Sequence, residues 1–193
     1  ALVFAQEYEA EFVSMAGTLV KRKQLVWGLP STTATLCVGV DLAITRKTYS
    51  DYTAIVVVAR APEADYVVRA HRGRWSFRET VRLIEEYAAG ASLVAVEAVQ
   101  YQAALVEELV RVTRLPVVPV VPQQDKIARF LPLLTRIEQG LLRFSPDLPD
   151  WYIDELLSFP EGAHDDAVDA TVYAVFAPYV GKPDDLVLRY LRR

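Results

Sequence analysis

The stretch Thr35-Leu36-Cys37-Val38-Gly39-Val40-Asp41-Leu42-Ala43 is an apolar run that ends by presenting one carboxylate. Side chains alternate across a β-strand, so the bulky Leu36, Val38 and Val40 share one face. Asp41 lies on the opposite face with two small neighbours, which leaves space for a helix to pack closely there. A lone aspartate at a strand end usually begins a turn or caps a helix. Its function therefore depends on whether other carboxylates converge on it.

The composition is that of one ordinary globular domain. The chain has 193 residues, of which 52% are hydrophobic and 24% charged. No apolar run approaches the roughly 18 residues that a membrane span needs, and the first residues lack a secretory signal, so we expect a soluble, intracellular protein. Its single cysteine, Cys37, excludes an internal disulfide and a cysteine-rich zinc site. Any metal is expected to have oxygen ligands, which favours magnesium or manganese.

The formal net charge of -4 argues, taken alone, against a protein that coats DNA. The sum hides the distribution, however, because a cluster of acids can be neutralised locally by divalent ions. A nucleic-acid substrate is therefore not excluded. Basic residues gather at 21–23, at 46–47, at Arg69, Arg72, Arg74, Arg78 and Arg82, and at Arg189, Arg192 and Arg193.

The order of apolar patterns predicts an α/β fold. Three consecutive strands joined by short turns indicate an antiparallel meander, and helices and strands alternate after it. We expect a mixed sheet of five to six strands flanked by helices on both faces. The expected strands are 35–41, 53–59, 66–72, 93–97, 117–121 and 141–144, and the expected helices are 4–15, 76–90, 102–113, 125–138, 150–159 and 164–175.

Acids recur at two further places. Glu97 ends the fourth strand as Asp41 ends the first, and the last helix begins with Asp165, Asp166 and Asp169. At roughly 100° per residue, Asp169 lies about 40° from Asp165 around that helix and borders its apolar stripe. Charge is costly at such an interior edge unless a cation or hydrogen-bond donors offset it. Aspartates in a first turn also stabilise a helix by capping and through its dipole, so this interpretation stays open.

These acids would meet if the first and fourth strands are parallel neighbours, because the carboxyl ends of such strands lie at one edge of a sheet. Carboxylates at close range repel one another, so the arrangement makes sense mainly as a cage for divalent ions. Two metal ions roughly 4 Å apart can activate a water and stabilise the leaving oxygen in phosphodiester cleavage. The pattern therefore predicts phosphoryl transfer to water.

The ordered set of acids resembles the ribonuclease H-like nuclease superfamily. More narrowly, the chain is similar to the C-terminal nuclease domain of the large terminase subunit of tailed bacteriophages, over about residues 10 to 178. The motif His164-Asp165-Asp166-Ala167-Val168-Asp169-Ala170 carries this resemblance together with Asp41 and Glu97. Further matching stretches are Glu11-Phe12 with Gly17, 125–140 and Leu156-Leu157-Ser158-Phe159-Pro160.

The resemblance implies a metal-dependent endonuclease that hydrolyses phosphodiester bonds of double-stranded viral DNA during genome packaging. It implies two Mg²⁺ or Mn²⁺ ions and a place in the host cytoplasm. The implied partners are double-stranded DNA, an upstream packaging ATPase domain, the portal and the small terminase subunit, with no membrane. On this basis 1–34 is a lead-in from the ATPase domain, 35–180 the nuclease domain and 181–193 a charged tail.

Carried over by position, the catalytic metal ligands are Asp41, Glu97 and one or both of Asp165 and Asp166. Asp169 is either a further ligand or an acid that supports one.

Other residues have implied contacts with DNA. His164 orients a ligand or approaches the phosphate. Arg46 and Lys47, in the turn just past Asp41, are placed to meet a phosphate, while Lys126 and Arg129 touch the DNA backbone.

Other classes of protein remain open. Within the same fold, a Holliday-junction resolvase or a ribonuclease H would use similar acids. An actin-like or sugar-kinase nucleotide-binding domain also begins with an Asp-bearing strand, but carries glycines in the first turn, where 42–47 has none. A non-catalytic assembly domain would use the acids only as helix caps. The chain contains no Gly-x-x-x-x-Gly-Lys-[Ser/Thr] phosphate loop, so either the ATPase lies upstream or the resemblance is to the nuclease half alone.

Overall fold

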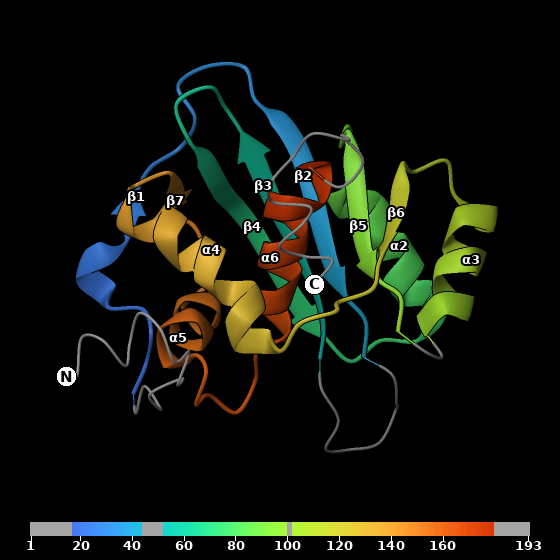
Figure 1. Ribbon diagram of the computed structural model, residues 1–193. Helices are drawn as coiled ribbons and strands as arrows, with labels where there is room; N and C mark the ends of the chain where they lie inside the picture. Colours follow the sequence, from blue (N-terminus) through green and yellow to red (C-terminus); the bar gives the residue numbers. More distant parts are fainter. Residues whose placement is uncertain (1–16, 44–51, 100–101, 180–193) are drawn as a thin grey trace.

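A mixed sheet of seven strands in the order β1-β7-β4-β3-β2-β5-β6 forms the middle layer of the fold (Figure 1). The computed structural model describes residues 17–43, 52–99 and 102–179. The strands are β1 (Val26–Trp27), β2 (Thr35–Asp41), β3 (Thr53–Arg60), β4 (Asp65–Gly73), β5 (Leu93–Glu97), β6 (Val117–Val120) and β7 (Leu142–Phe144). The helices are η1 (Arg22–Gln24), α2 (Phe77–Tyr87), α3 (Gln102–Val112), α4 (Lys126–Glu138), α5 (Asp150–Ser158), α6 (Asp166–Phe176) and η2 (Ala177–Tyr179).

The strand pairing confirms the predicted topology. β2, β3 and β4 form an antiparallel meander, and β2 also pairs in parallel with β5, where Val40 lies opposite Val96. The residues that follow these two partners, Asp41 and Glu97, therefore leave the sheet at the same edge, the lower one in Figure 1. The sheet has one strand more than the five to six expected. That strand, β1, is only two residues long and pairs with β7, so it has no alternating pattern from which to predict it.

Helices cover both faces of the sheet, as predicted. One face packs against α4, α5 and α6, and its core includes Val56 and Phe130. The other face packs against α2 and α3 and includes Val38 and Ile84. The near-continuous apolar runs of β3 and β5 follow from this, because a strand covered on both faces has no solvated side.

Helix α6 is the innermost helix, since every residue from Asp166 to Phe176 is buried (Figure 1). It approaches β2 at Gly39, where an added Cβ atom would lie 1.8 Å from the Ala170 carbonyl oxygen and 2.8 Å from the Ala174 nitrogen. Only a glycine fits at that distance. This confirms the prediction that the small residues beside Asp41 make space for a helix.

Part of the expected lead-in 1–34 packs against the domain, because Leu19, Val20 and Leu25 belong to the buried core. The bounds of the domain stay a prediction. The expected helix 4–15, the charged tail 181–193 and the residues Arg46 and Lys47 lie outside the described residues. Within the described part of the chain, the helices are too short or too polar to cross a bilayer.

Candidate active site

The carboxyl ends of β2 and β5 bring Asp41 and Glu97 together, as the parallel pairing requires. Burial raises the pKa of Asp41 well above its usual range, and the charges of Glu97, Asp169 and Asp166 raise it further. A hydrogen bond from the protonated Asp41 carboxyl to Glu97 adds to the same shift. Two strand ends and one helix thus meet at one electrostatically coupled cluster of acids.

The first turn of α6 is capped from another helix. The buried Glu155 of α5 accepts hydrogen bonds from the backbone amides of Ala167, at 2.6 Å, and Val168, at 3.3 Å. Asp165, the residue at the N-cap position, makes no capping hydrogen bond with its side chain. Capping by a glutamate from α5 thereby leaves the Asp165 carboxylate available for other contacts. The interpretation of Asp165 as a simple helix cap is wrong.

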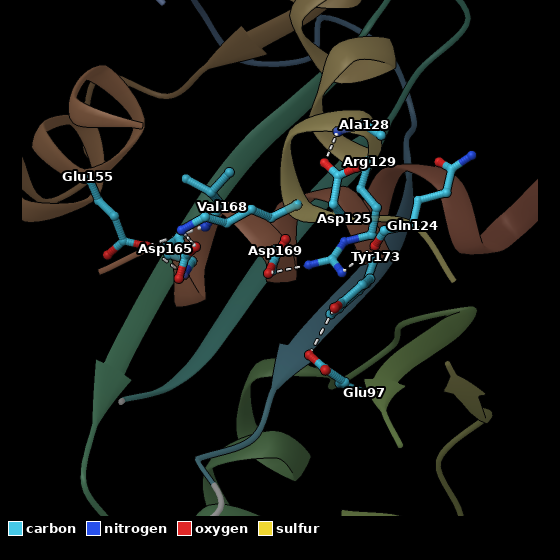
Figure 2. A network of polar contacts seen from close by, with 12 residues as sticks. Glu97, Gln124, Asp125, Ala128, Arg129, Glu155, Asp165, Val168, Asp169 and Tyr173 are labelled. Atoms are coloured by element: carbon cyan, nitrogen blue, oxygen red, sulfur yellow. Dashed lines mark hydrogen bonds and ion pairs between the residues drawn. The ribbon is translucent and has the colours of Figure 1, made fainter. Parts of the chain in front are cut away.

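Helix α4 supplies two cations to the acids of α6. The Lys126 ammonium lies 2.8 Å from the Asp165 carboxylate. The Arg129 guanidinium lies 2.6 Å from the Asp169 carboxylate (Figure 2). Asp165 and Asp169 are one helical turn apart and Lys126 and Arg129 nearly so, which is why the pairs align. In the structure both cations lie against the acids, and their contact with DNA stays a prediction.

These two ion pairs differ in burial. The side chains of Arg129 and Asp169 are 13% and 12% exposed, whereas those of Lys126 and Asp165 are 47% and 33% exposed. Burial raises the pKa of Asp169 to about 6, although Arg129 opposes that shift. In the buried pair of Arg129 and Asp169, loss of one partner therefore leaves a poorly solvated charge.

Tyr173, about two turns after Asp166 on α6, holds Glu97 in place. Its hydroxyl donates a hydrogen bond of 2.8 Å to the Glu97 carboxylate (Figure 2). Burial raises the pKa of Tyr173, so the phenol keeps its proton and remains a donor. Neither Tyr173 nor Glu155 was predicted from the sequence. The aspartates of α6 marked that helix as a candidate part of the site. A tyrosine and a glutamate among apolar helix positions have no sequence pattern that indicates a contact with the site.

The donor set has the chemistry of a divalent-metal site. Five carboxylates, from Asp41, Glu97, Asp165, Asp166 and Asp169, gather with two cations from α4, which leaves excess negative charge at a half-buried edge. Oxygen donors of this kind suit hard cations. Among the described residues, no three such side chains already stand around a common point as ligands. Asp165 and Asp169 are instead paired with Lys126 and Arg129 of α4, and Glu97 accepts the hydrogen bond from Tyr173.

Electrostatic interactions link Asp41 with Glu97, Asp166 and Asp169, and link Asp169 with Asp165, while their role as metal ligands stays a prediction. His164 lies at the cluster's border, with its Nδ1 atom 3.9 Å from an Asp166 carboxylate oxygen, which is too long for a hydrogen bond. Its ring contacts the edge of Tyr52, with ring centroids 4.8 Å apart.

An antiparallel meander followed by parallel strands, with carboxylates where β2 and β5 end, defines the fold as ribonuclease H-like. Residues 38–177 match the family model described as the terminase RNaseH-like domain. The chain belongs to this family.

Solved structures agree with the family match at the level of fold. The P22 large terminase nuclease domain has a TM-score of 0.67 and 12% identity, with 92% of this chain and 98% of that one covered. The large terminase nuclease of thermophilic phage G20c with bound magnesium has a TM-score of 0.63 and 16% identity, covering 82% and 96%. For the large terminase of a second thermophilic bacteriophage the TM-score is 0.64 and the identity 14%, covering 84% of this chain and 45% of that one. The chain thus spans less than half of that longer protein. No curated protein matches it.

Replacing Arg129 with glutamine is expected to lower the free energy of unfolding in EDTA by about 3 kcal/mol, because Asp169 would lose its buried partner. Lys126→Gln is the matched control, and its half-exposed pair predicts a loss of no more than about 1 kcal/mol. Urea unfolding of both variants measures the difference. Equal losses would show that Arg129 does not neutralise the site.

Proposed function

We propose that this domain is a divalent-metal-dependent endonuclease that hydrolyses phosphodiester bonds of double-stranded DNA during viral genome packaging. The observation that carries the proposal is the meeting of the ends of β2 and β5 with the start of α6, which brings the charges of Glu97, Asp166 and Asp169 close to the buried Asp41. A protein keeps such a repulsive cluster at a half-buried edge mainly when a bound cation offsets the repulsion. The G20c nuclease, a relative in fold, has structures with bound magnesium and with bound zinc.

In this proposal Asp41, Glu97 and Asp166 hold the metal, from two strand ends and one helix start. Asp165 and Asp169 stand at the side of α4, where Lys126 and Arg129 limit their charge. Mg²⁺ or Mn²⁺, with two ions as the expected number, would supply an activated water and stabilise charge on the phosphate.

The surrounding residues hold the carboxylates in place. Tyr173 donates to one oxygen of Glu97 and so limits the rotation of that carboxylate. Glu155 fixes the first turn of α6, and Arg72 in turn lies 2.6 Å from the Glu155 carboxylate. Such supporting contacts matter because a ligand set that is misplaced by about 1 Å loses much of its activity.

We further propose that the domain works beside a packaging ATPase in a longer protein. The longer large terminase from the second thermophilic bacteriophage also has a structure in complex with ADP, and this chain covers 46% of it. The portal and the small terminase subunit stay the partners that family membership predicts, and the host cytoplasm the expected place of action.

The experiment is a nicking assay on supercoiled plasmid with Mg²⁺, Mn²⁺ or EDTA. We expect cleavage with either metal and none in EDTA. Glu97→Gln keeps the size of the side chain and an acceptor for Tyr173, so we expect it to fold and to lose cleavage by about 10²-fold or more. Cleavage of linear duplex, four-way junction and RNA–DNA hybrid should favour the duplex. Preference for the junction or the hybrid would replace this proposal with a resolvase or a ribonuclease H.

A further inference from the structure

A cluster of arginines and aromatic rings lies beside the acids at the same edge of the sheet. The Arg72 guanidinium lies 4.8 Å from the centroid of the Tyr52 ring and 4.4 Å from that of Trp151. The Arg74 guanidinium lies 4.2 Å from the Tyr52 ring, so one tyrosine carries two arginines. Cations held over aromatic faces in this way are restricted in orientation. We call Tyr52, Arg72, Arg74, Trp151 and His164 the arginine–aromatic cluster.

The register of the sheet sets the distance between this cluster and the acids. Asp41 pairs with Ala54 on β3, and Ala54 pairs with Arg72 on β4, so the three lie in one row across the strands. Two strand spacings place the backbones of Asp41 and Arg72 about 10 Å apart. His164 fills the interval, since it contacts the Tyr52 ring and lies beside Asp166. The cluster is therefore a continuation of the acidic site.

The two arginines have different surroundings. Arg72 has a side chain only 22% exposed and forms an ion pair of 2.6 Å with Glu155. Arg74, just past the end of β4, is exposed. Its position on the Tyr52 ring directs a positive charge to the solvent next to an acidic edge. A guanidinium in such a position matches a phosphate group in charge and in donor geometry.

We propose that Arg74, supported by the ring of Tyr52, binds a backbone phosphate of duplex DNA to one side of the bond that is cut. This inference rests on the proposed function. A domain of net charge -4 needs local cations to hold a polyanion, and the cluster places an exposed guanidinium within reach of the acids. Arg72, which forms an ion pair with Glu155, also contacts the Tyr52 ring. The proposal assigns a function to one arginine of the basic group that runs from Arg69 to Arg82.

The test compares Arg74→Ala with Arg82→Ala by fluorescence anisotropy on labelled duplex DNA. Both variants are made in the Glu97→Gln background, so that Mg²⁺ can be present without cleavage. Arg82 is an exposed arginine on α2, paired with Glu86, and serves as the matched control. Loss of one phosphate contact should raise the Kd about threefold or more and lower the slope of log Kd against log salt by about 0.9. Tyr52→Leu should change the Kd in the same direction.

In the otherwise wild-type protein, Arg74→Ala should raise KM and leave kcat unchanged, because Arg74 lies away from the reacting atoms. Duplex cleavage by the wild type is measured first, and its failure would overturn the proposed function itself. If the wild type cleaves and Arg74→Ala binds duplex as Arg82→Ala does, the inference alone is overturned. Equal weakening by both substitutions would also overturn it, since that result reports general attraction rather than a defined contact.

Discussion

Replacing Asp41 with asparagine is expected to abolish cleavage and, without metal, to make the domain more stable. An asparagine side chain is a poorer ligand for a cation, and loss of metal stabilisation worth several kcal/mol corresponds to a rate lower by about 10³-fold or more. The same change removes a carboxyl group whose ionisation is opposed by burial and by three neighbouring acids. Function and stability are thus expected to move in opposite directions at one residue.

Proton linkage gives the pH dependence of this effect. The pKa of an aspartate in an unfolded chain is about 3.9, and the fold raises that of Asp41. Below the unfolded value both states are protonated, and the stability is complete. As the pH rises, the unfolded state loses its proton first, so the free energy of unfolding falls until the folded Asp41 also ionises. Asp169, with its pKa raised to about 6, adds a loss of the same sign between roughly pH 4 and 6.

Thermal unfolding in EDTA across this pH range measures the prediction. The Asp41→Asn variant should match the wild type near pH 4 and exceed it increasingly toward pH 8, because only the wild type carries the Asp41 penalty. Asp154→Asn, at an exposed position on α5, is the control and should change neither stability nor cleavage. A wild type more stable than Asp41→Asn in EDTA at pH 8 would contradict the view that the acids repel one another.

Local patterns predict most of this fold, because its strands and helices are long and strongly apolar. The parallel pairing of β2 with β5 was the condition under which Asp41 and Glu97 would meet, and the structure fulfils it. The two-residue β1 has too few residues for any periodicity. Similarly, the burial of Leu19 and Val20 within the expected lead-in could not be predicted, because a short irregular segment has no periodicity.

The acids of the site were predictable, but the contacts that hold them were not. Helical geometry placed Asp165 and Asp169 on one face, and both indeed meet α4. Which cations they would meet depends on how α4 crosses α6, a tertiary property, so the ion pairs with Lys126 and Arg129 were not predicted. The Glu155 cap comes from a different helix for the same reason. The packing of one helix against another decides which side chains contact the acids. The spacing of residues within one helix does not indicate that packing.

Gly39→Ala is expected to lower the stability of the domain and, in the molecules that still fold, its activity. The added Cβ would lie 1.8 Å from the Ala170 carbonyl oxygen and 2.8 Å from the carbonyl carbon, so α6 must move away from β2. Overpacking against a backbone cannot be relieved by a side-chain rotation, and we expect a loss of about 3 kcal/mol or more. For a domain of this size that corresponds to a melting temperature lower by about 10 °C.

The loss of activity should exceed the loss of folded protein, because α6 carries Asp166 and Tyr173 and any shift of the helix displaces both from the ends of β2 and β5. Gly28→Ala is the matched control, since its Cβ would meet only Tyr66 at an ordinary 3.9 Å. Adding Ala170→Gly to Gly39→Ala should not restore stability, because the clash is with the backbone of residue 170 rather than its methyl group. Rescue by that second substitution, measured by thermal unfolding and plasmid nicking, would show that the contact between β2 and α6 is made by side chains and is looser than described.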